Sequence, residues 1–203
     1  MKKMWLVFLA ALILMPGPVL ADNFEQLRKD SARIKTITSD FVQKKSMKIL
    51  SKPLVSEGKF YYAAPDFIRW EYAKPIRSVV LSGKGVTKRF MASGGKMVED
   101  KTGGAQTMKI VLDQVAGWMS GKFDSNPAFK ATLQDGPPTM ITLVPMEKSM
   151  AGFFERIEIV VSRKDASIKS VRIVESASAE TRIDFAHVVI NADIAPSIFQ
   201  DVQ

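Results

Sequence analysis

Apolar and polar residues alternate over most of the chain after about residue 36, and this pattern predicts β-strands. The clearest case is 67–72, where Ile68, Trp70 and Tyr72 would share one face and Arg69 and Glu71 the other. Strands are predicted to begin near residue 36 and to follow at 56–64, 67–72, 79–82, 86–91, 96–98, 129–134, 139–144, 154–163, 168–176 and 181–189. Because the turns between them are short, neighbouring strands should pair in antiparallel order.

Two segments have helical spacing instead. Apolar residues from Phe24 to Phe41 recur at intervals close to one helical turn, which predicts a first helix over 22–38. A second helix is predicted over 106–120, and Gly121 stands where a helix-terminating glycine belongs. Its apolar stripe consists of Met108, Val111, Leu112, Val115 and Met119.

About ten antiparallel strands and two helices give an α+β chain, which we expect to form a single domain. Since each strand has one apolar face, the strands should form a curved sheet or an open barrel, and the two helices should cover its concave face. Two short helices cover a wide concave face incompletely, which favours a hydrophobic cavity. The alternative is that side chains fill this space and form an ordinary core.

The cavity is predicted to be lined by the apolar faces of the aromatic strands, by the second helix above them and by a C-terminal strand opposite. The predicted lining residues are Phe60, Tyr62, Ile68, Trp70, Tyr72, Leu112, Val115, Met119, Ile157 and Ile159. For each of them, plain core packing is the alternative.

The N-terminus has the three regions of a secretory signal peptide. Lys2 and Lys3 precede an apolar run over 4–15, which is too short to span a bilayer of about 30 Å as a helix. Helix-breaking residues follow, and small residues then predict cleavage between Ala21 and Asp22. We therefore expect an exported protein with a signal peptide over 1–21 and one domain over 22–203. An uncleaved membrane anchor is the alternative.

The charge is basic but dispersed. The formal net charge is +8 in 203 residues, and loss of Lys2 and Lys3 would leave +6. The basic residues form no single stripe, so nucleic acid is not an expected partner. Attraction to an anionic membrane surface or to an acidic partner is one interpretation, and a solvated lysine-rich surface is the other.

The chain offers little chemistry for catalysis. It has no cysteine and one histidine, His187, which lies in an alternating segment without a Gly-x-Ser-x-Gly motif. The glycine-lysine turns at 83–85 and 94–96 lack the remainder of a phosphate-binding loop. We therefore expect no enzyme, metal or cofactor, and we keep an esterase that uses His187 with Asp184 only as a weak alternative.

Four stretches carry a family resemblance. They are ITSDFVQ at 37–43, SEGKFYY at 56–62 with Pro65, FIRWEY at 67–72 with Pro75 and 79–83, and TLVP at 142–145 with 157–161, 168–175 and 181–185. In order and spacing, the chain resembles the periplasmic outer-membrane lipoprotein carrier family (LolA-like). The resemblance implies an unclosed antiparallel β-barrel with helices as a lid over a hydrophobic cavity.

The resemblance also implies a function and partners. It indicates a periplasmic carrier or chaperone that shields lipoprotein acyl chains, or another acylated lipid, between an inner-membrane donor and an outer-membrane acceptor. A monomer is expected. A lipid- or lipoprotein-sensing regulator is the alternative, although the related regulators carry an additional domain.

One position departs from the family pattern. Family carriers have an arginine directly before the proline that ends the second strand, and that arginine contacts the lid helices. Here Ala64 precedes Pro65. The resemblance therefore implies that the lid latch is absent or is built from other residues, for which Arg69 and Lys74 are the candidates.

Overall fold

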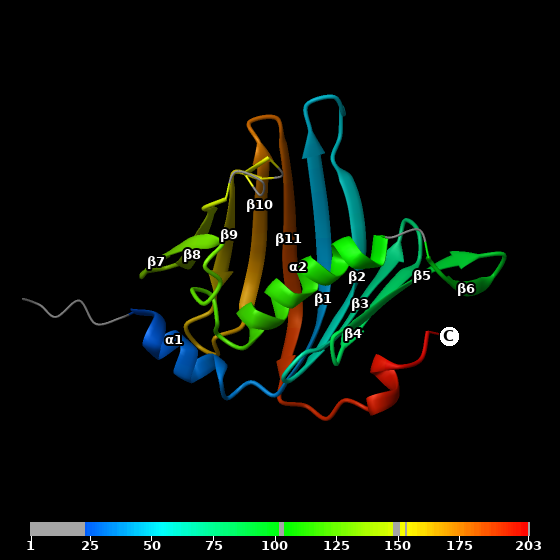
Figure 1. Cartoon of the computed structure of the whole chain (residues 1–203), viewed down its shortest axis with the longest axis horizontal. Helices are drawn as coiled ribbons and strands as arrows, with labels where there is room; N and C mark the ends of the chain where they lie inside the picture. The colour runs from blue at the N-terminus through cyan, green and yellow to red at the C-terminus, as the bar shows by residue number, and fades with distance from the viewer. Residues whose placement is uncertain (1–22, 102–103, 148–150, 153, 203) are drawn as a thin grey trace, which may run out of the picture.

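The computed structural model describes residues 23–101, 104–147, 151–152 and 154–202 (Figure 1). Two α-helices, a short 3₁₀-helix and a single antiparallel sheet make up this part of the chain. The helices are α1 (Asn23–Ser31), α2 (Gly104–Met119) and η1 (Pro196–Phe199). The strands are β1 (Thr36–Met47), β2 (Leu54–Ala63), β3 (Phe67–Lys74), β4 (Ser78–Gly83), β5 (Val86–Ser93), β6 (Lys96–Glu99), β7 (Phe129–Gln134), β8 (Thr139–Pro145), β9 (Arg156–Val161), β10 (Ile168–Ser176) and β11 (Ala179–Ile190).

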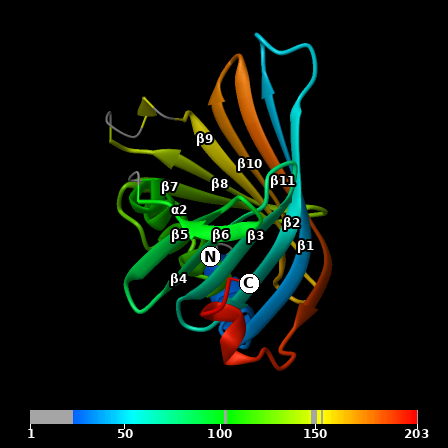
Figure 2. The same ribbon diagram turned by 90° about the vertical axis from the view of Figure 1, so that its right-hand side faces the viewer.

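The sheet is an open, curved sheet in the order β6-β5-β4-β3-β2-β1-β11-β10-β9-β8-β7. Two antiparallel meanders, β1–β6 and β7–β11, meet where the first strand pairs with the last. We call these meanders the N-terminal wing (β1–β6) and the C-terminal wing (β7–β11). Figure 2 shows both wings bending toward the side on which α2 lies. The predicted unclosed antiparallel sheet is therefore confirmed, with β6 and β7 as its two edges. In the described part of the chain, no helix is long and apolar enough to cross a bilayer.

Most strand boundaries agree with the predicted ones, and the differences lie at the N-terminal helix and at the first hairpin. The helix α1 ends at Ser31, earlier than predicted, because the chain turns at Ile34 and enters β1. The series that extended the predicted helix mixed helix residues with Phe41, which lies in a strand. Strands β1 and β2 reach Met47 and Leu54, so their hairpin is longer than predicted. The signal-peptide prediction lies outside the described residues.

A β-bulge in β11 keeps the inward face of this strand apolar. The register between β1 and β11 shifts between Thr38 and Asp40, so that β11 has one extra residue there. His187 takes a positive φ of 51° at this point. Because the extra residue resets the alternation, Phe185 and Val188 both pack against the core.

The core lies between α2 and the concave face of the sheet. The buried side chains of α2 are Leu112, Val115, Ala116, Trp118 and Met119. Below them lie the inward residues of the strands, among which Phe41, Phe60, Tyr62, Ile68, Ile141 and Ile159 are almost completely buried. The side chains of Lys109 and 111–119 form no hydrogen bond or ion pair with the sheet, so apolar packing holds this part of α2 in place.

The C-terminal end of α2 is anchored to α1. The amide of Lys122 bonds the carbonyl of Gly117 (2.8 Å), and that of Gly121 bonds Trp118 (3.0 Å), the pattern of a Schellman cap. Gly121 has a φ of +77°, which confirms its predicted role. A Cβ at Gly121 would lie 2.8 Å from the Cβ of Ser31, so the glycine also lets α1 approach closely.

Gly58 tests the packing of the curved sheet. A Cβ there would lie 1.9 Å from the carbonyl oxygen of Glu71 and 2.8 Å from the ring of Phe41. Gly58→Ala should therefore lower the free energy of unfolding by about 1–3 kcal/mol or more, measured by urea denaturation. Gly117→Ala is the matched control, since its nearest contact is an ordinary 3.9 Å. It should be neutral or stabilise by up to about 1 kcal/mol, and equal losses in both variants would contradict the predicted crowding.

Candidate apolar-ligand site

An apolar pocket of about 160 Å³ lies between α2 and the C-terminal wing of the sheet. Gln114 is the one polar residue among those that line it, and the others are aliphatic or aromatic. The lining residues are Trp70, Val111, Gln114, Val115, Trp118, Met119, Phe129, Phe154, Ile157, Ile168, Val171, Ile173, Ile183 and Phe185. Space of this kind excludes ordered water and suits hydrocarbon.

Aromatic rings form one wall of the pocket. The ring centroids of Trp70 and Phe185 are 6.2 Å apart, and Trp70 also contacts Phe41 (5.1 Å) and Phe60 (5.3 Å). On the other side, Phe129 and Phe154 stack at 5.9 Å. Such pairs add about 0.5–1.5 kcal/mol each beyond area burial, so the aromatic contacts stabilise this side of the pocket.

The pocket opens toward the end of the sheet where β1 meets β2 and β10 meets β11. Val111 is 42% exposed, and Ile173 keeps partial exposure, whereas Val171, farther from this end, is buried. Thr181 lies opposite Ile173, and Lys45 lies opposite Thr181. The concave face therefore changes from apolar to polar within one cross-strand row.

This polar rim is an ion pair supported by a hydroxyl. The ammonium of Lys45 lies 3.1 and 3.0 Å from the two carboxylate oxygens of Glu175. The hydroxyl of Thr181 donates to the same carboxylate at 2.8 Å. An amphiphile whose chain entered the pocket would meet these groups with its polar end.

The predicted cavity residues divide into two groups. Trp70, Val115, Met119 and Ile157 line the pocket. The other six, Phe60, Tyr62, Ile68, Tyr72, Leu112 and Ile159, belong to the packed core around it. Sequence reasoning missed most of the C-terminal wall and Trp118, which follows Val115 at helical spacing and could have been found on that ground.

Arg69 and Lys74, the candidate lid latch, make other contacts. Arg69 points away from α2 and pairs with Glu71 (2.7 Å) and with the carbonyls of Ile198 and Asp201 in the C-terminal segment. Lys74 pairs with Glu57 on β2 (3.0 Å). Because β3 alternates, Arg69 lies on the opposite face from Trp70, so it holds the C-terminal segment rather than α2.

His187 is remote from the pocket. Its Nδ1 lies 2.9 Å from a carboxylate oxygen of Asp40, and its side chain is 83% exposed on the outer face. Asp184, the proposed triad partner, pairs with Arg182 instead. This arrangement offers no nucleophile or acid–base pair at the apolar pocket.

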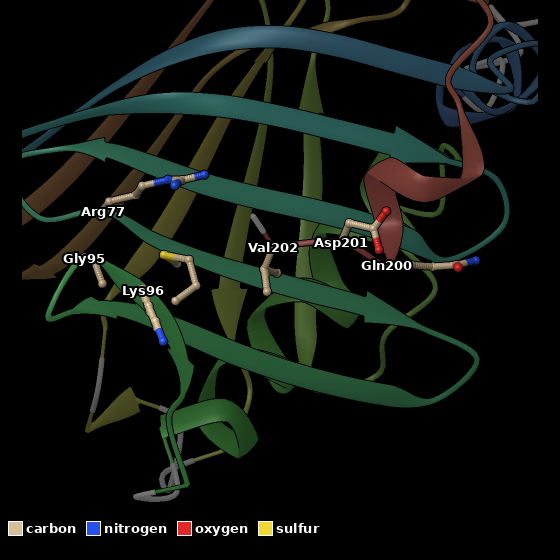
Figure 3. Close-up of a pocket in the computed structure, with 8 residues that line it drawn as sticks. Arg77, Gly95, Lys96, Gln200, Asp201 and Val202 are labelled. Atoms are coloured by element: carbon tan, nitrogen blue, oxygen red, sulfur yellow. The ribbon is translucent and has the colours of Figure 1, made fainter.

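A second hollow, shown in Figure 3, lies between the C-terminal segment and the β5–β6 hairpin. It is larger, about 720 Å³, but it is open to solvent and mixes polar with apolar groups. Its lining residues are Arg77, Ala92, Gly95, Lys96, Met97, Gln200, Asp201 and Val202. An open surface of this composition is well solvated, so the smaller pocket under α2 is the better candidate for an apolar ligand.

Two tyrosines on the concave side have perturbed acidity. Burial raises the pKa of Tyr72 above its usual value of 10.0, and the nearby Trp70 N–H and Arg89 lower it only in part. Burial, together with the charge of Asp66, raises the pKa of Tyr62. The hydroxyl of Tyr72 donates to the side-chain oxygen of Gln43 at 2.9 Å, at the edge of the aromatic wall.

These shifts predict a loss of stability at alkaline pH. Above about pH 10 the unfolded chain releases its tyrosine protons more readily than the folded chain, so the free energy of unfolding should fall as the pH rises. Tyr72→Phe should make this decline shallower in urea denaturation between about pH 9 and about pH 11. The same slope in Tyr72→Phe as in wild type would contradict the assignment.

The open antiparallel sheet thus holds an apolar pocket under one helix, and a concave site with this lining is suited to a hydrophobic ligand. The model of the family described as outer membrane lipoprotein carrier protein LolA matches residues 32–201. The chain therefore belongs to the LolA family, as its four sequence stretches predicted. No enzyme family is indicated, and a comparison with curated protein sequences finds no significant match.

Solved structures are similar to this chain at low sequence identity. A DUF1329 family protein from Desulfovibrio piger is 9% identical, with a TM-score of 0.51 over 87% of this chain and 95% of that one. The LolA superfamily protein NE2245 from Nitrosomonas europaea is 7% identical, with a TM-score of 0.43 over 87% and 97%. A chain of the MucA/MucB complex of Pseudomonas aeruginosa is 12% identical, with a TM-score of 0.43 over 88% of this chain and 59% of that one. Only the Desulfovibrio piger protein exceeds a TM-score of 0.5, and at 9% identity its similarity bears on the fold alone.

Proposed function

We propose that this protein is a periplasmic carrier that shelters the acyl chains of a lipoprotein, or of another acylated lipid, beneath α2. The supporting observation is the pocket itself, whose lining is aliphatic and aromatic except for Gln114. In this proposal α2 is the lid and the protein works between the two membranes, and the predicted signal peptide supports this location. An inner-membrane donor would load the carrier, and an outer-membrane acceptor would unload it.

The size of the pocket implies that the lid moves. A cavity of about 160 Å³ is near the volume that holds a benzene-sized molecule, whereas ordinary ligand pockets measure about 300–1,000 Å³. A long acyl chain therefore enters only if α2 shifts away from the sheet. The part of α2 over 111–119 is suited to this, because apolar contacts hold it to the sheet without polar bonds that must break.

The energetics are consistent with exchange of one apolar partner for another. Transfer of an acyl chain out of water contributes about 0.8 kcal/mol per CH₂, or on the order of 10 kcal/mol for a long chain. Lifting α2 exposes buried residues such as Leu112 and Met119, each at about 1.5–3 kcal/mol. Since these terms have similar size, the cargo would bind firmly and still be released to an acceptor. The Lys45–Glu175 rim would face its polar end.

A displacement assay tests the proposal. The purified protein without residues 1–21 should bind bis-ANS, and a triacylated lipopeptide should displace the dye at clearly lower concentration than a simple fatty acid does. The same peptide without acyl chains should not displace it. Equal displacement by both acylated ligands would favour a general lipid carrier, and absence of dye binding would contradict the proposed cavity.

A filled pocket gives a sharper test. Val115→Phe places an aromatic ring in the empty space and should weaken acyl-ligand binding by about tenfold or more, equivalent to about 1.4 kcal/mol. Its stability should change by less than about 1.5 kcal/mol, because the added volume enters a void. The control is Val144→Phe, which is 41% exposed on β8 and lies outside the pocket. Equal affinity in wild type and Val115→Phe would contradict binding under α2.

A further inference from the structure

The tip of the β1–β2 hairpin concentrates exposed apolar side chains. Ile49 is 89% exposed, Leu54 55% and Val55 45%, and they lie within seven residues of chain. Solvent normally surrounds isolated apolar residues, but three large aliphatic side chains together on one loop mark an interaction site. Figure 2 shows this hairpin projecting beyond the neighbouring β10–β11 hairpin.

The same tip is basic. Residues 44–55 contain Lys44, Lys45, Lys48 and Lys52 and no acidic residue. Lys45 pairs with Glu175, while the other three are exposed on the flanks of the loop or strand. The nearest turn, 177–178, carries no charge and accepts a bond from the amide of Lys48 at 2.8 Å. Lysines therefore surround the aliphatic end.

We propose that this tip, residues 47–55, docks on an anionic lipid bilayer. Aliphatic side chains that enter the acyl boundary, flanked by lysines that reach lipid phosphates, are the two features of interfacial membrane binding. A protein partner is disfavoured, because a specific complex buries about 800 Å² on each side and a narrow projecting loop offers little flat surface. The charge of the tip complements an anionic membrane surface.

The tip and the mouth of the apolar pocket lie at the same end of the sheet. Leu54 lies opposite Lys45 on the concave face, in the same cross-strand row as Thr181 and Ile173. The row thus runs from the tip, over the polar rim, to the pocket lining. A tip in contact with the bilayer would bring the pocket mouth close to the membrane surface, whether or not the pocket holds lipid.

A fluorescent label at the tip tests the proposal, and the absence of native cysteine makes single labelling straightforward. Ile49→Cys labelled with an environment-sensitive dye should shift to the blue with phosphatidylcholine vesicles that contain phosphatidylglycerol. Val86→Cys, 57% exposed at the β4–β5 turn, is the matched control and should not shift. Absence of a shift at Ile49→Cys, or equal shifts at both positions, would overturn the proposal and leave a protein partner for the tip.

Sedimentation with the same vesicles separates the electrostatic contribution of the lysines from the hydrophobic contribution of Ile49. Lys48→Gln together with Lys52→Gln should weaken binding by on the order of twentyfold. Ile49→Ser should weaken it by about tenfold. The matched change Lys130→Gln, on the far edge strand, should have no effect. Wild-type binding in both tip variants would contradict the proposal.

The pocket-filling variant keeps this inference separate from the proposed function. Val115→Phe should bind vesicles as wild type does, because the tip is unchanged. Loss of vesicle binding in Val115→Phe would mean that the protein holds the membrane through the pocket, and the tip proposal would fail. Loss of acyl-ligand binding with normal vesicle binding would instead leave the tip proposal intact.

Discussion

Pairing of the first strand with the last holds the two wings of this sheet together. β1 and β11 are far apart in the sequence, yet they form a long antiparallel ladder from Ile37–Ile190 to Met47–Ala179, interrupted by one bulge. Pairing strands so far apart in sequence costs loop-closure entropy. Burial of apolar side chains on a common concave face, to which both meanders contribute, offsets this cost. The bulge at His187 maintains this face, because it returns Val188 to the interior after an outward residue. Without the pairing, neither wing could enclose α2.

The pocket forms because one helix is too small to fill the concave face of the sheet. A single helix of 16 residues covers a concave face built from many strands. Its segment 111–119 rests on the sheet through apolar contacts. Trp70 and Phe185 fill one side of the space, and the aliphatic residues of β9 to β11 line the other without closing it. A complete core would have been more stable. The remaining space is consistent with a site that exchanges hydrocarbon with the helix above it.

Much of the fold was predictable because alternation determines which face of a strand is buried. The boundaries of β3, β4 and β7 agree with the predicted ones to within two residues or less. The choice of lining residues was not predictable to this degree, since Phe60 and Trp70 share a face and only the placement of α2 makes one of them core and the other lining. The extended hairpin was missed because 47–55 does not alternate. The contacts of Arg69 were not predictable from its own strand, because its partners, Ile198 and Asp201, lie at the other end of the chain.

Tryptophan quenching tests the central claim, that acyl chains bind beneath α2, most directly. The chain has three tryptophans, of which Trp5 lies in the predicted signal peptide and both Trp70 and Trp118 line the pocket. Lipopeptides with brominated acyl chains should quench the emission of the protein without residues 1–21, and Trp70→Phe and Trp118→Phe should each retain quenching of the remaining indole. Displacement of a surface-bound dye without quenching of either tryptophan would contradict the account.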